Sequence, residues 1–430
     1  MCYTVTVNKI KNLPPHYRWN FLVFVVDVIS FKAAFAFVDP NSVLPAFVRQ
    51  FTDWAPVIGL VTTVVNGFWL LPQLLVARLI NDRPYKKPYL LAGLIGRASF
   101  WVVALALWMG LARHSTAILI LFFVCVAFFT ASDGFTTVAW FDVLARAIPL
   151  RRRGRLLGTA QAIGGLAGAG VGVLIGLILG SPSLFFPANY ALIFFLAGVA
   201  FIPSVIALTT LREPPPEENS VETNGLAKNG WLIPLRDPAF RRVMGCRMLI
   251  GMIALATPFY VVHASDVLHL SDSAVGSFVA AQTLAVVVAG PLLGMVSERW
   301  GPQYVIRIGG VGAAVAPLFA LATHLVKSDW MVQAYPFVYA ALGFTQSSWI
   351  LGFFNYLLEI APADLRPLYV GLGSTIMGAL TLVPIVGGWL LETTSYTALF
   401  GVTAALMLLG TLFSLRLGPP SRIALTEEPL

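Results

Sequence analysis

The sequence has little charge, little cysteine and little histidine. Only 11% of its 430 residues are Asp, Glu, Lys or Arg, whereas soluble domains carry about 25%. The three cysteines, Cys2, Cys125 and Cys246, are too widely spaced for a disulfide framework or a metal cluster. The five histidines form no His-Glu-x-x-His pair, and no Gly-x-x-x-x-Gly-Lys-Ser/Thr phosphate loop occurs. We therefore predict that the protein is not an enzyme or an ATP-driven pump, and that it has no cofactor and no metal site.

Long apolar runs are what the sequence has in abundance. Hydrophobic residues make up 58% of the chain, and one bilayer span needs about 20 mostly apolar residues. The runs predict twelve transmembrane helices, at residues 19–44, 55–80, 88–111, 116–146, 156–181, 187–210, 241–265, 274–297, 303–325, 332–358, 367–390 and 395–416.

The net charge of +8 comes from Lys and Arg in the short loops between these runs. With both termini in the cytoplasm, 22 of the 28 Lys and Arg residues lie in cytoplasmic segments, and only Arg49, Arg113 and Lys327 lie outside. Such a bias is typical of topogenic signals in membrane proteins, so it indicates membrane lipid as a partner and not nucleic acid. We expect an integral membrane protein with both termini cytoplasmic, in the inner membrane of a bacterial cell.

The two halves of the chain carry similar loops. Asp82-Arg83 and Glu298-Arg299 each follow the second span of a half, 216 residues apart. A Pro, an Arg and a Gly recur at an offset of 213, as Pro149/Pro362, Arg153/Arg366 and Gly158/Gly371. The proline-rich, polar segment between the halves has the composition of a flexible linker.

We therefore predict an N-terminal six-helix bundle (1–210), a cytoplasmic linker (211–240), a C-terminal six-helix bundle (241–416) and a cytoplasmic tail (417–430). The predicted fold class is an all-α polytopic membrane protein, with twelve transmembrane helices in two pseudosymmetric six-helix bundles.

The loop Gly294-x-x-x-Glu298-Arg299-x-Gly301 is the most specific motif in the chain. With six plus six helices and a central linker, the chain resembles the major facilitator superfamily, whose members carry such a loop after the second helix of each half. The resemblance implies that cytoplasmic gate residues latch the outward-facing state. In this sequence they are Asp82, Arg83, Asp142, Arg153, Glu298, Arg299, Glu359 and Arg366. Alternatively, the basic residues in these loops only establish topology and bind anionic lipid headgroups.

Ionisable residues inside the predicted spans are candidates for function, because a charge within the bilayer is costly. Asp27 and Lys32 lie in the first span, and Asp133 lies in the fourth. The resemblance implies that these spans line a central cavity, so the two carboxyls are candidates to carry a coupling proton. Lys32 is a candidate to neutralise a carboxylate or to meet an anionic substrate. Arg97, in the third span, is a candidate for a structural ion pair, for example with Asp133.

The second half carries fewer charged residues within its spans. Gln346 and Asn355 of the tenth span, like Gln282 of the eighth, are candidates to bind substrate or to hydrogen-bond across helices. Arg247 of the seventh span is a structural candidate that could instead snorkel to the interface. The aromatic residues of the tenth span could line a cavity or only pack. His263, at the end of the seventh span, is expected to be solvated.

These observations favour a secondary active transporter that moves a small molecule by alternating access, with protons as the favoured coupling ion. The substrate class and the direction of transport stay open. The alternative is a polytopic membrane protein without net transport, either a small-molecule receptor or a lipid-handling protein. The two functions differ in whether gates on the two sides of the membrane open in turn.

Overall fold

The structure is a computed structural model, and it describes residues 13–80, 83–215, 232–362 and 365–420. Over these ranges the chain forms helices and no strand. Twelve helical segments within them are long and apolar enough to cross a membrane, which confirms the prediction. They are Tyr17–Ala36, Ala55–Gln73, Lys87–Trp108, Ser115–Ala147, Leu150–Leu179, Ala188–Thr210, Pro238–Asp266, Ala274–Trp300, Pro302–Val326, Pro336–Ile360, Leu368–Thr393 and Tyr396–Ser414.

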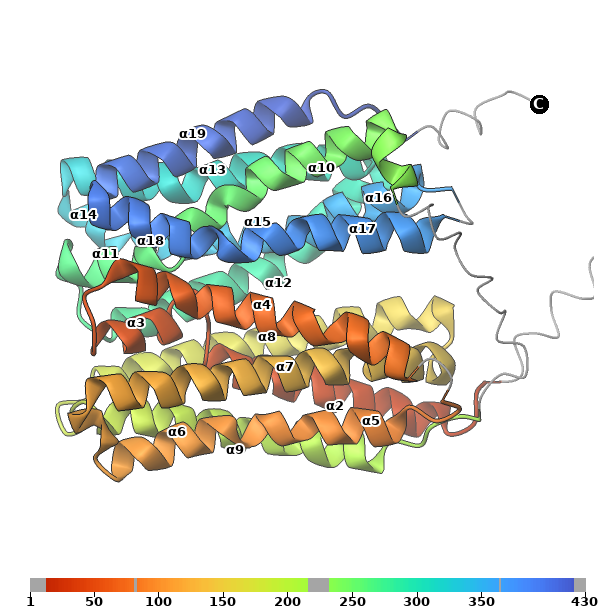
Figure 1. Cartoon of the computed structure of the whole chain (residues 1–430), viewed down its shortest axis with the longest axis horizontal. Helices are drawn as coiled ribbons and strands as arrows, with labels where there is room; N and C mark the ends of the chain where they lie inside the picture. Colours follow the sequence, from red (N-terminus) through yellow and green to blue (C-terminus); the bar gives the residue numbers. More distant parts are fainter. Residues whose placement is uncertain (1–12, 81–82, 216–231, 363–364, 421–430) are drawn as a thin grey trace, which may run out of the picture. The chain divides into compact units, whose positions relative to one another are not determined.

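The helices follow the chain in the order labelled in Figure 1. The first half contains α2 (Tyr17–Ala36), α3 (Val43–Arg49), α4 (Ala55–Ile80), α5 (Lys87–Gly93), α6 (Ser99–Trp108), α7 (Ser115–Ala147), α8 (Leu150–Leu179) and α9 (Ala188–Thr210). The second half contains α10 (Pro238–Gly251), α11 (Phe259–Asp266), α12 (Ala274–Trp300), α13 (Pro302–Val326), α14 (Asp329–Gln333), α15 (Pro336–Ser348), α16 (Asn355–Ile360), α17 (Arg366–Gly378), α18 (Val383–Thr393) and α19 (Tyr396–Ser414). We call the membrane side on which α2 begins the proximal side, and the opposite side the distal side.

The first span is shorter than the sequence predicted. Its helix α2 ends at Ala36, and α3 begins only at Val43, so a continuous helix through residue 44 is wrong. The break contains Asp39-Pro40. Pro40 has no backbone N–H, and its ring disfavours helical geometry at Asp39. The break therefore turns the chain at the distal end of the span.

Several other spans are interrupted. Short 3-10 segments lie in the third, seventh and eleventh spans, at η1 (Leu94–Ala98), η4 (Met252–Leu255) and η6 (Ala379–Leu382). The tenth span contains a π-helix at Trp349–Phe354, between α15 and α16. π-Helices are rare, and single turns of this kind occur frequently at functional sites.

Contacts divide the chain into two compact units. Unit 1 takes its described residues from 1–37, 68–168 and 191–221, and unit 2 takes its residues from 38–67, 169–190 and 222–430. Within unit 1, Phe24 of α2 and Leu208 of α9 are fully buried in one apolar cluster with residues of α4, α5, α7 and α8. Within unit 2, α15 packs against α12 and α13, and α19 packs against α13 (Figure 1). The rings of Phe278 on α12 and Tyr339 on α15 stack at 4.5 Å.

Unit 2 joins distal segments of the first half of the chain to the second half through backbone contacts. At Gly276 of α12, an added Cβ would lie 2.3 Å from the carbonyl oxygen of Gly172 on α8. At Gly59 of α4, an added Cβ would lie 2.3 Å from the carbonyl oxygen of Pro384 on α18. Cβ atoms do not approach other atoms so closely, so only glycine permits these two helix pairs to touch.

Candidate transport and gate sites

A buried ion pair ties together four helical segments of unit 1. Asp27 of α2 is 4% exposed, and its Oδ1 lies 3.7 Å from Nη2 of Arg97 in η1. Trp140 Nε1 of α7 donates to Asp27 Oδ2 at 2.8 Å. The Ser204 hydroxyl of α9 donates to Asp27 Oδ1 and accepts from Arg97. Asp27 is therefore both charge-compensated and hydrogen-bonded, as a buried carboxylate requires.

Asp133 of α7 is less directly compensated than Asp27. Its Oδ2 accepts a hydrogen bond from Trp69 Nε1 of α4 at 3.2 Å. The structure gives the ion pair of Arg97 to Asp27, and not to Asp133 as the sequence suggested. The two candidate proton carriers thus have different environments: Asp27 is paired with a cation, and Asp133 is bonded to a neutral indole.

Lys32 lies on the same helix as Asp27 but does not join the ion pair. Its stem packs against α8, where a Cβ added to Gly164 would lie 2.9 Å from Lys32 Cδ. In the described ranges, no carboxylate lies within ion-pair distance of its ammonium group. The structure therefore holds the apolar stem in place and leaves the charged end uncompensated.

Glu213, which was predicted to lie in the linker, joins α5 and α7 on the proximal side of unit 1. Glu213 accepts hydrogen bonds from the backbone N–H groups of Lys86 (2.8 Å) and Lys87 (2.9 Å), at the start of α5. Arg146 Nη2 of α7 lies 2.6 Å from Glu213 Oε1 and 2.6 Å from Asp142 Oδ1. The Glu213 side chain is only 5% exposed. The first residues assigned to a solvated linker are therefore anchored to unit 1.

The other predicted gate residues make fewer contacts. Asp82 lies outside the described residues. Arg153 donates to the backbone carbonyls of Ala145 and Ile148, and Glu359 has a buried Oε2 for which the described residues supply no hydrogen-bond partner. Four residues are exposed and show no ion pair within the described ranges: Arg83, Glu298, Arg299 and Arg366. Their role as a latch stays a prediction.

On the distal side, a buried carboxylate links the break in the first span to α12. Asp39 is 7% exposed. Its Oδ1 accepts from Ser42 Oγ (2.8 Å) and from the backbone N–H of Asn41 (3.0 Å), and its Oδ2 accepts from Gln282 Nε2 (3.1 Å). Burial raises the pKa of Asp39, and these hydrogen bonds oppose the rise. Gln282 thus bonds across helices, one of the two interpretations of the sequence.

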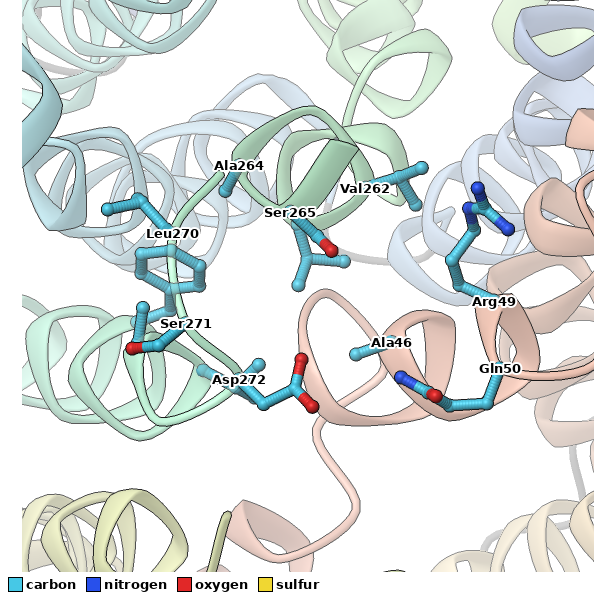
Figure 2. A pocket seen from close by; sticks show the side chains of 13 residues that line it. Ala46, Arg49, Gln50, Val262, Ala264, Ser265, Leu270, Ser271 and Asp272 are labelled. Carbon is cyan, nitrogen blue, oxygen red and sulfur yellow. The ribbon is translucent and has the colours of Figure 1, made fainter. Parts of the chain in front are cut away.

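A second distal contact is an ion pair at the surface. Arg49 Nε of α3 lies 2.9 Å from Asp266 Oδ2 of α11, and Arg49 also pairs with Asp53. A small pocket lies beside it, between α3 and the segment that leads into α12. Figure 2 shows the Asp272 carboxylate pointing toward Ala46, with Arg49 at the other end of the pocket. Burial raises the pKa of Asp272.

His263 is not solvated, so that expectation is wrong. It is completely buried. Its Nδ1 lies 2.9 Å from the Tyr335 hydroxyl, and its Nε2 lies 3.1 Å from His324 Nδ1. The rings of Tyr396 and Phe400 of α19 also contact it, with centroids 5.0 and 5.1 Å from that of His263. Among the residues that the structure describes, no group of three or more His, Cys, Asp or Glu is placed to hold a metal ion.

The tenth span places aromatic rings next to Arg247. The centroids of Trp349 and Phe353, both in the π-helix, are 6.2 Å apart. The guanidinium carbon of Arg247 on α10 lies 5.5 Å from the first centroid and 6.0 Å from the second. Gln346 is exposed, and Asn355 donates to the Leu351 carbonyl at 3.2 Å.

Three polar contacts were not found by reasoning from the sequence: Glu213 with Arg146, Asp39 with Gln282, and Arg49 with Asp266. Glu213 has a local signal, because an acid directly after a span and beside a basic loop can cap a neighbouring helix. The two distal contacts join residues more than 200 positions apart, and no local pattern marks such pairs.

The twelve apolar spans of the described residues define a polytopic helical membrane protein. The chain belongs to the Major Facilitator Superfamily, whose family model matches residues 22–263 and 243–429. It is therefore an integral membrane protein of a transporter family.

Three other proteins are similar to this chain in sequence or in fold. An uncharacterized protein of Mycobacterium tuberculosis (strain H37Rv) is 23% identical over 302 residues, which are 69% of this chain and 57% of that protein. The chain thus matches little more than half the length of this relative. A bacterial homologue of the iron transporter ferroportin covers 93% of this chain and 98% of its own, with 14% identity and a TM-score of 0.69 in its inward-facing state. Its outward-facing state, with soaked iron, gives a TM-score of 0.58 at 16% identity.

A bacterial homologue of the human lysosomal transporter Spinster, inward-facing and unoccupied, is also similar. It has a TM-score of 0.67 and 14% identity, over 93% of this chain and 96% of its own. At such low identity, these structures share the fold with this chain, and they say nothing of its substrate.

Proposed function

We propose that the protein is a secondary active transporter that works by alternating access and is coupled to protons. The observation that carries this proposal is the distal gate, which we define as the contacts of Gly172 with Gly276, Gly59 with Pro384, and Arg49 with Asp266. Each contact joins a distal segment of the first repeat to the second repeat. Each rests on van der Waals packing or on an exposed ion pair, and such contacts can be made and broken repeatedly.

The buried carboxyls of unit 1 are the proposed proton carriers. Asp27 is held by Arg97, Ser204 and Trp140, so protonation of Asp27 would release the Arg97 guanidinium from its only ion pair among the described residues. Asp133 has no cation within ion-pair distance in the same ranges. Coupling follows if a proton on either carboxyl changes which conformation is the more stable.

The sidedness of the membrane follows from the loop charges. We propose that the proximal side is cytoplasmic, because 22 of the 28 Lys and Arg residues lie on that side in the predicted topology. Both termini are then cytoplasmic, and the membrane is the inner membrane of a bacterial cell.

Single cysteines on the two sides of the membrane test this function. In a background with the native cysteines replaced by serine, Ala264→Cys reports on the distal side, because Ala264 is 1% exposed and lines the pocket of Figure 2. Glu298→Cys reports on the proximal side. The engineered pair Arg49→Cys/Asp266→Cys replaces a 2.9 Å contact, and oxidation of this pair locks the distal gate.

A transporter predicts that an impermeant maleimide labels Ala264→Cys slowly but measurably, and that the oxidised lock abolishes this labelling. The lock should also increase labelling of Glu298→Cys, because it removes the state in which the proximal side is closed. A receptor or lipid-handling protein without alternating access predicts no labelling at Ala264→Cys and no effect of the lock at Glu298→Cys. That result would refute the proposed function.

A further inference from the structure

Unit 2 contains a cation inside a membrane span that no described residue neutralises. Arg247 lies within the span Pro238–Asp266. Its Nε atom is buried and has no hydrogen-bond partner in the described ranges. No carboxylate in those ranges lies within ion-pair distance of its guanidinium group. Guanidinium groups stay charged in proteins, so this is an uncompensated charge in a medium where charges are costly.

The aromatic rings beside Arg247 compensate only part of that cost. Trp349 and Phe353 lie 5.5 and 6.0 Å from the guanidinium carbon, within the range of cation–π attraction. The face of an aromatic ring attracts a cation, but it does not replace an oxygen atom that accepts a hydrogen bond from the buried Nε–H group. The arrangement therefore lacks an anion that can accept hydrogen bonds.

The local backbone brings the aromatic rings together at this point. Trp349 and Phe353 both belong to the π-helix, and their ring planes are inclined at 51°. Gln346 precedes Trp349 by three residues, so it lies on the same face of the helix. Gln346 is exposed, and its amide makes no hydrogen bond within the described part of the chain. A guanidinium group, an amide and the half-buried Trp349 ring therefore lie along one stretch of the tenth and seventh spans, with the buried Phe353 ring behind them.

The first span of each half carries a cation, Lys32 in the first half and Arg247 in the second. Lys32 lies 15 residues after the start of its span at Tyr17, and Arg247 lies nine residues after the start of its span at Pro238, so the two cations lie at different depths. Neither cation has an acidic partner among the described residues.

We propose that Arg247, Trp349 and Phe353 form a binding site for an organic carboxylate with a flat apolar body. The carboxylate accepts two parallel hydrogen bonds from the guanidinium group. The Trp349 ring contacts the apolar body. The Phe353 ring, which is 1% exposed, packs behind Trp349 and Arg247, and the Gln346 amide lies further along the same helix face. The claim that such a compound is transported rests on the proposed function, whereas the claim that it binds at this site is independent of that function.

Probes of matched shape test the site in the full chain. The protein is purified in dodecyl maltoside, because this detergent has no phosphate group that could compete for Arg247. The probes are 1-naphthoate, the neutral 1-naphthamide and the cationic 1-naphthylmethylamine, and the readout is the dissociation constant from tryptophan fluorescence. We expect 1-naphthoate to bind at least about tenfold more tightly than the other two. Arg247→Gln should weaken 1-naphthoate about 10- to 100-fold, as expected for loss of a charge-assisted hydrogen bond, and leave 1-naphthamide unchanged.

Arg307→Gln is the matched control. Arg307 lies five residues after the start of the span Pro302–Val326, near its proximal end. It also contacts a ring (Tyr304, at 4.9 Å) and also has a buried Nε atom without a hydrogen-bond partner in the described ranges. Unlike Arg247, it donates to the Leu417 carbonyl at 2.9 Å. We expect Arg307→Gln to leave 1-naphthoate affinity unchanged. If Arg247→Gln does not fold, Arg247→Lys serves instead, because it keeps the charge and loses the planar fork. It should weaken 1-naphthoate about tenfold.

Three results would overturn the proposal. The first is equal affinity for 1-naphthoate and 1-naphthamide. The second is unchanged 1-naphthoate affinity in both Arg247 variants. The third is competitive displacement of 1-naphthoate by phosphatidylglycerol, which would identify the ligand as a lipid headgroup reached by a snorkelling arginine. Failure of alternating access in the cysteine experiment, with naphthoate binding intact, would instead refute transport and leave a carboxylate receptor.

Discussion

Replacement of Gly276 by alanine should open the distal gate. The added Cβ would lie 2.3 Å from the Gly172 carbonyl oxygen and 2.3 Å from the Gly176 backbone nitrogen, so α8 and α12 must separate by about 1 Å to reach ordinary contact distance. Overpacking of this kind costs about 1–3 kcal/mol. Since about 1.4 kcal/mol is a factor of ten, the closed-gate population should fall about 5- to 150-fold relative to the open one.

Gly290→Ala is the control for this prediction. Gly290 lies on the same helix, and an added Cβ there has no neighbour within 4 Å. Gly276 lies in the first turn of α12 and Gly290 lies directly before Pro291, so the two substitutions differ in helix propensity. Thermal unfolding of both variants measures that difference separately from the effect on the gate. The assay is the rate at which an impermeant maleimide labels Ala264→Cys. We expect Gly276→Ala to raise this rate about 5- to 150-fold and Gly290→Ala to leave it nearly constant. Equal rates in the two variants would refute the argument that this glycine contact holds the gate closed.

Three further predictions follow from buried carboxylates. Asp39 bonds to Gln282 of α12, the helix that carries the gate residue Gly276, and burial in this closed arrangement raises the pKa of Asp39. Closure should therefore be favoured by acid and lost as the pH rises through that raised value. The ratio of Ala264→Cys labelling with Asp39 to that with Asp39→Asn should increase with pH, and a constant ratio would contradict this. Glu213→Gln weakens charge-assisted hydrogen bonds from Arg146 and from two backbone N–H groups. The free energy of unfolding, measured by thermal unfolding, should therefore fall by about 1–3 kcal/mol. The control Glu298→Gln changes an exposed residue and should have little effect. Asp27→Leu alone leaves Arg97 buried without its ion-pair partner and should lower the free energy of unfolding by about 3–5 kcal/mol. The double variant Asp27→Leu/Arg97→Met should recover much of this loss in thermal unfolding. No recovery would mean that the pair does not act as a unit.

The positions of the intramembrane charges could be predicted from the sequence, whereas the partners of these charges could not. Asp27, Lys32, Asp133 and Arg97 were identified because a charge inside an apolar run is visible without any structure. Their partners were not, since Arg97 pairs with Asp27 on another helix and not with Asp133. The choice depends on how α2, η1 and α7 are rotated about their axes, which apolar periodicity does not report when a helix is apolar all round.

The burial of His263 is a second feature that the sequence did not predict. Its position at the end of an apolar run predicted a solvated ring, but Tyr335 and His324 enclose it. These partners are more than 60 positions away along the chain. Burial at a span end depends on which other helices reach that level, and this is a property of the packed bundle.

By itself, the sequence determined the number of spans, the family and the positions of the intramembrane charges, because hydrophobic length and loop motifs are local properties. Only the tertiary structure decided which helices touch through Gly172 and Gly276, which acid caps α5, and that a π-helix places two rings beside Arg247. The physical reason is the distance along the chain between the residues that interact. A span forms wherever about 20 apolar residues follow one another, whereas a gate or a binding site forms only where distant segments pack closely enough for individual atoms to meet.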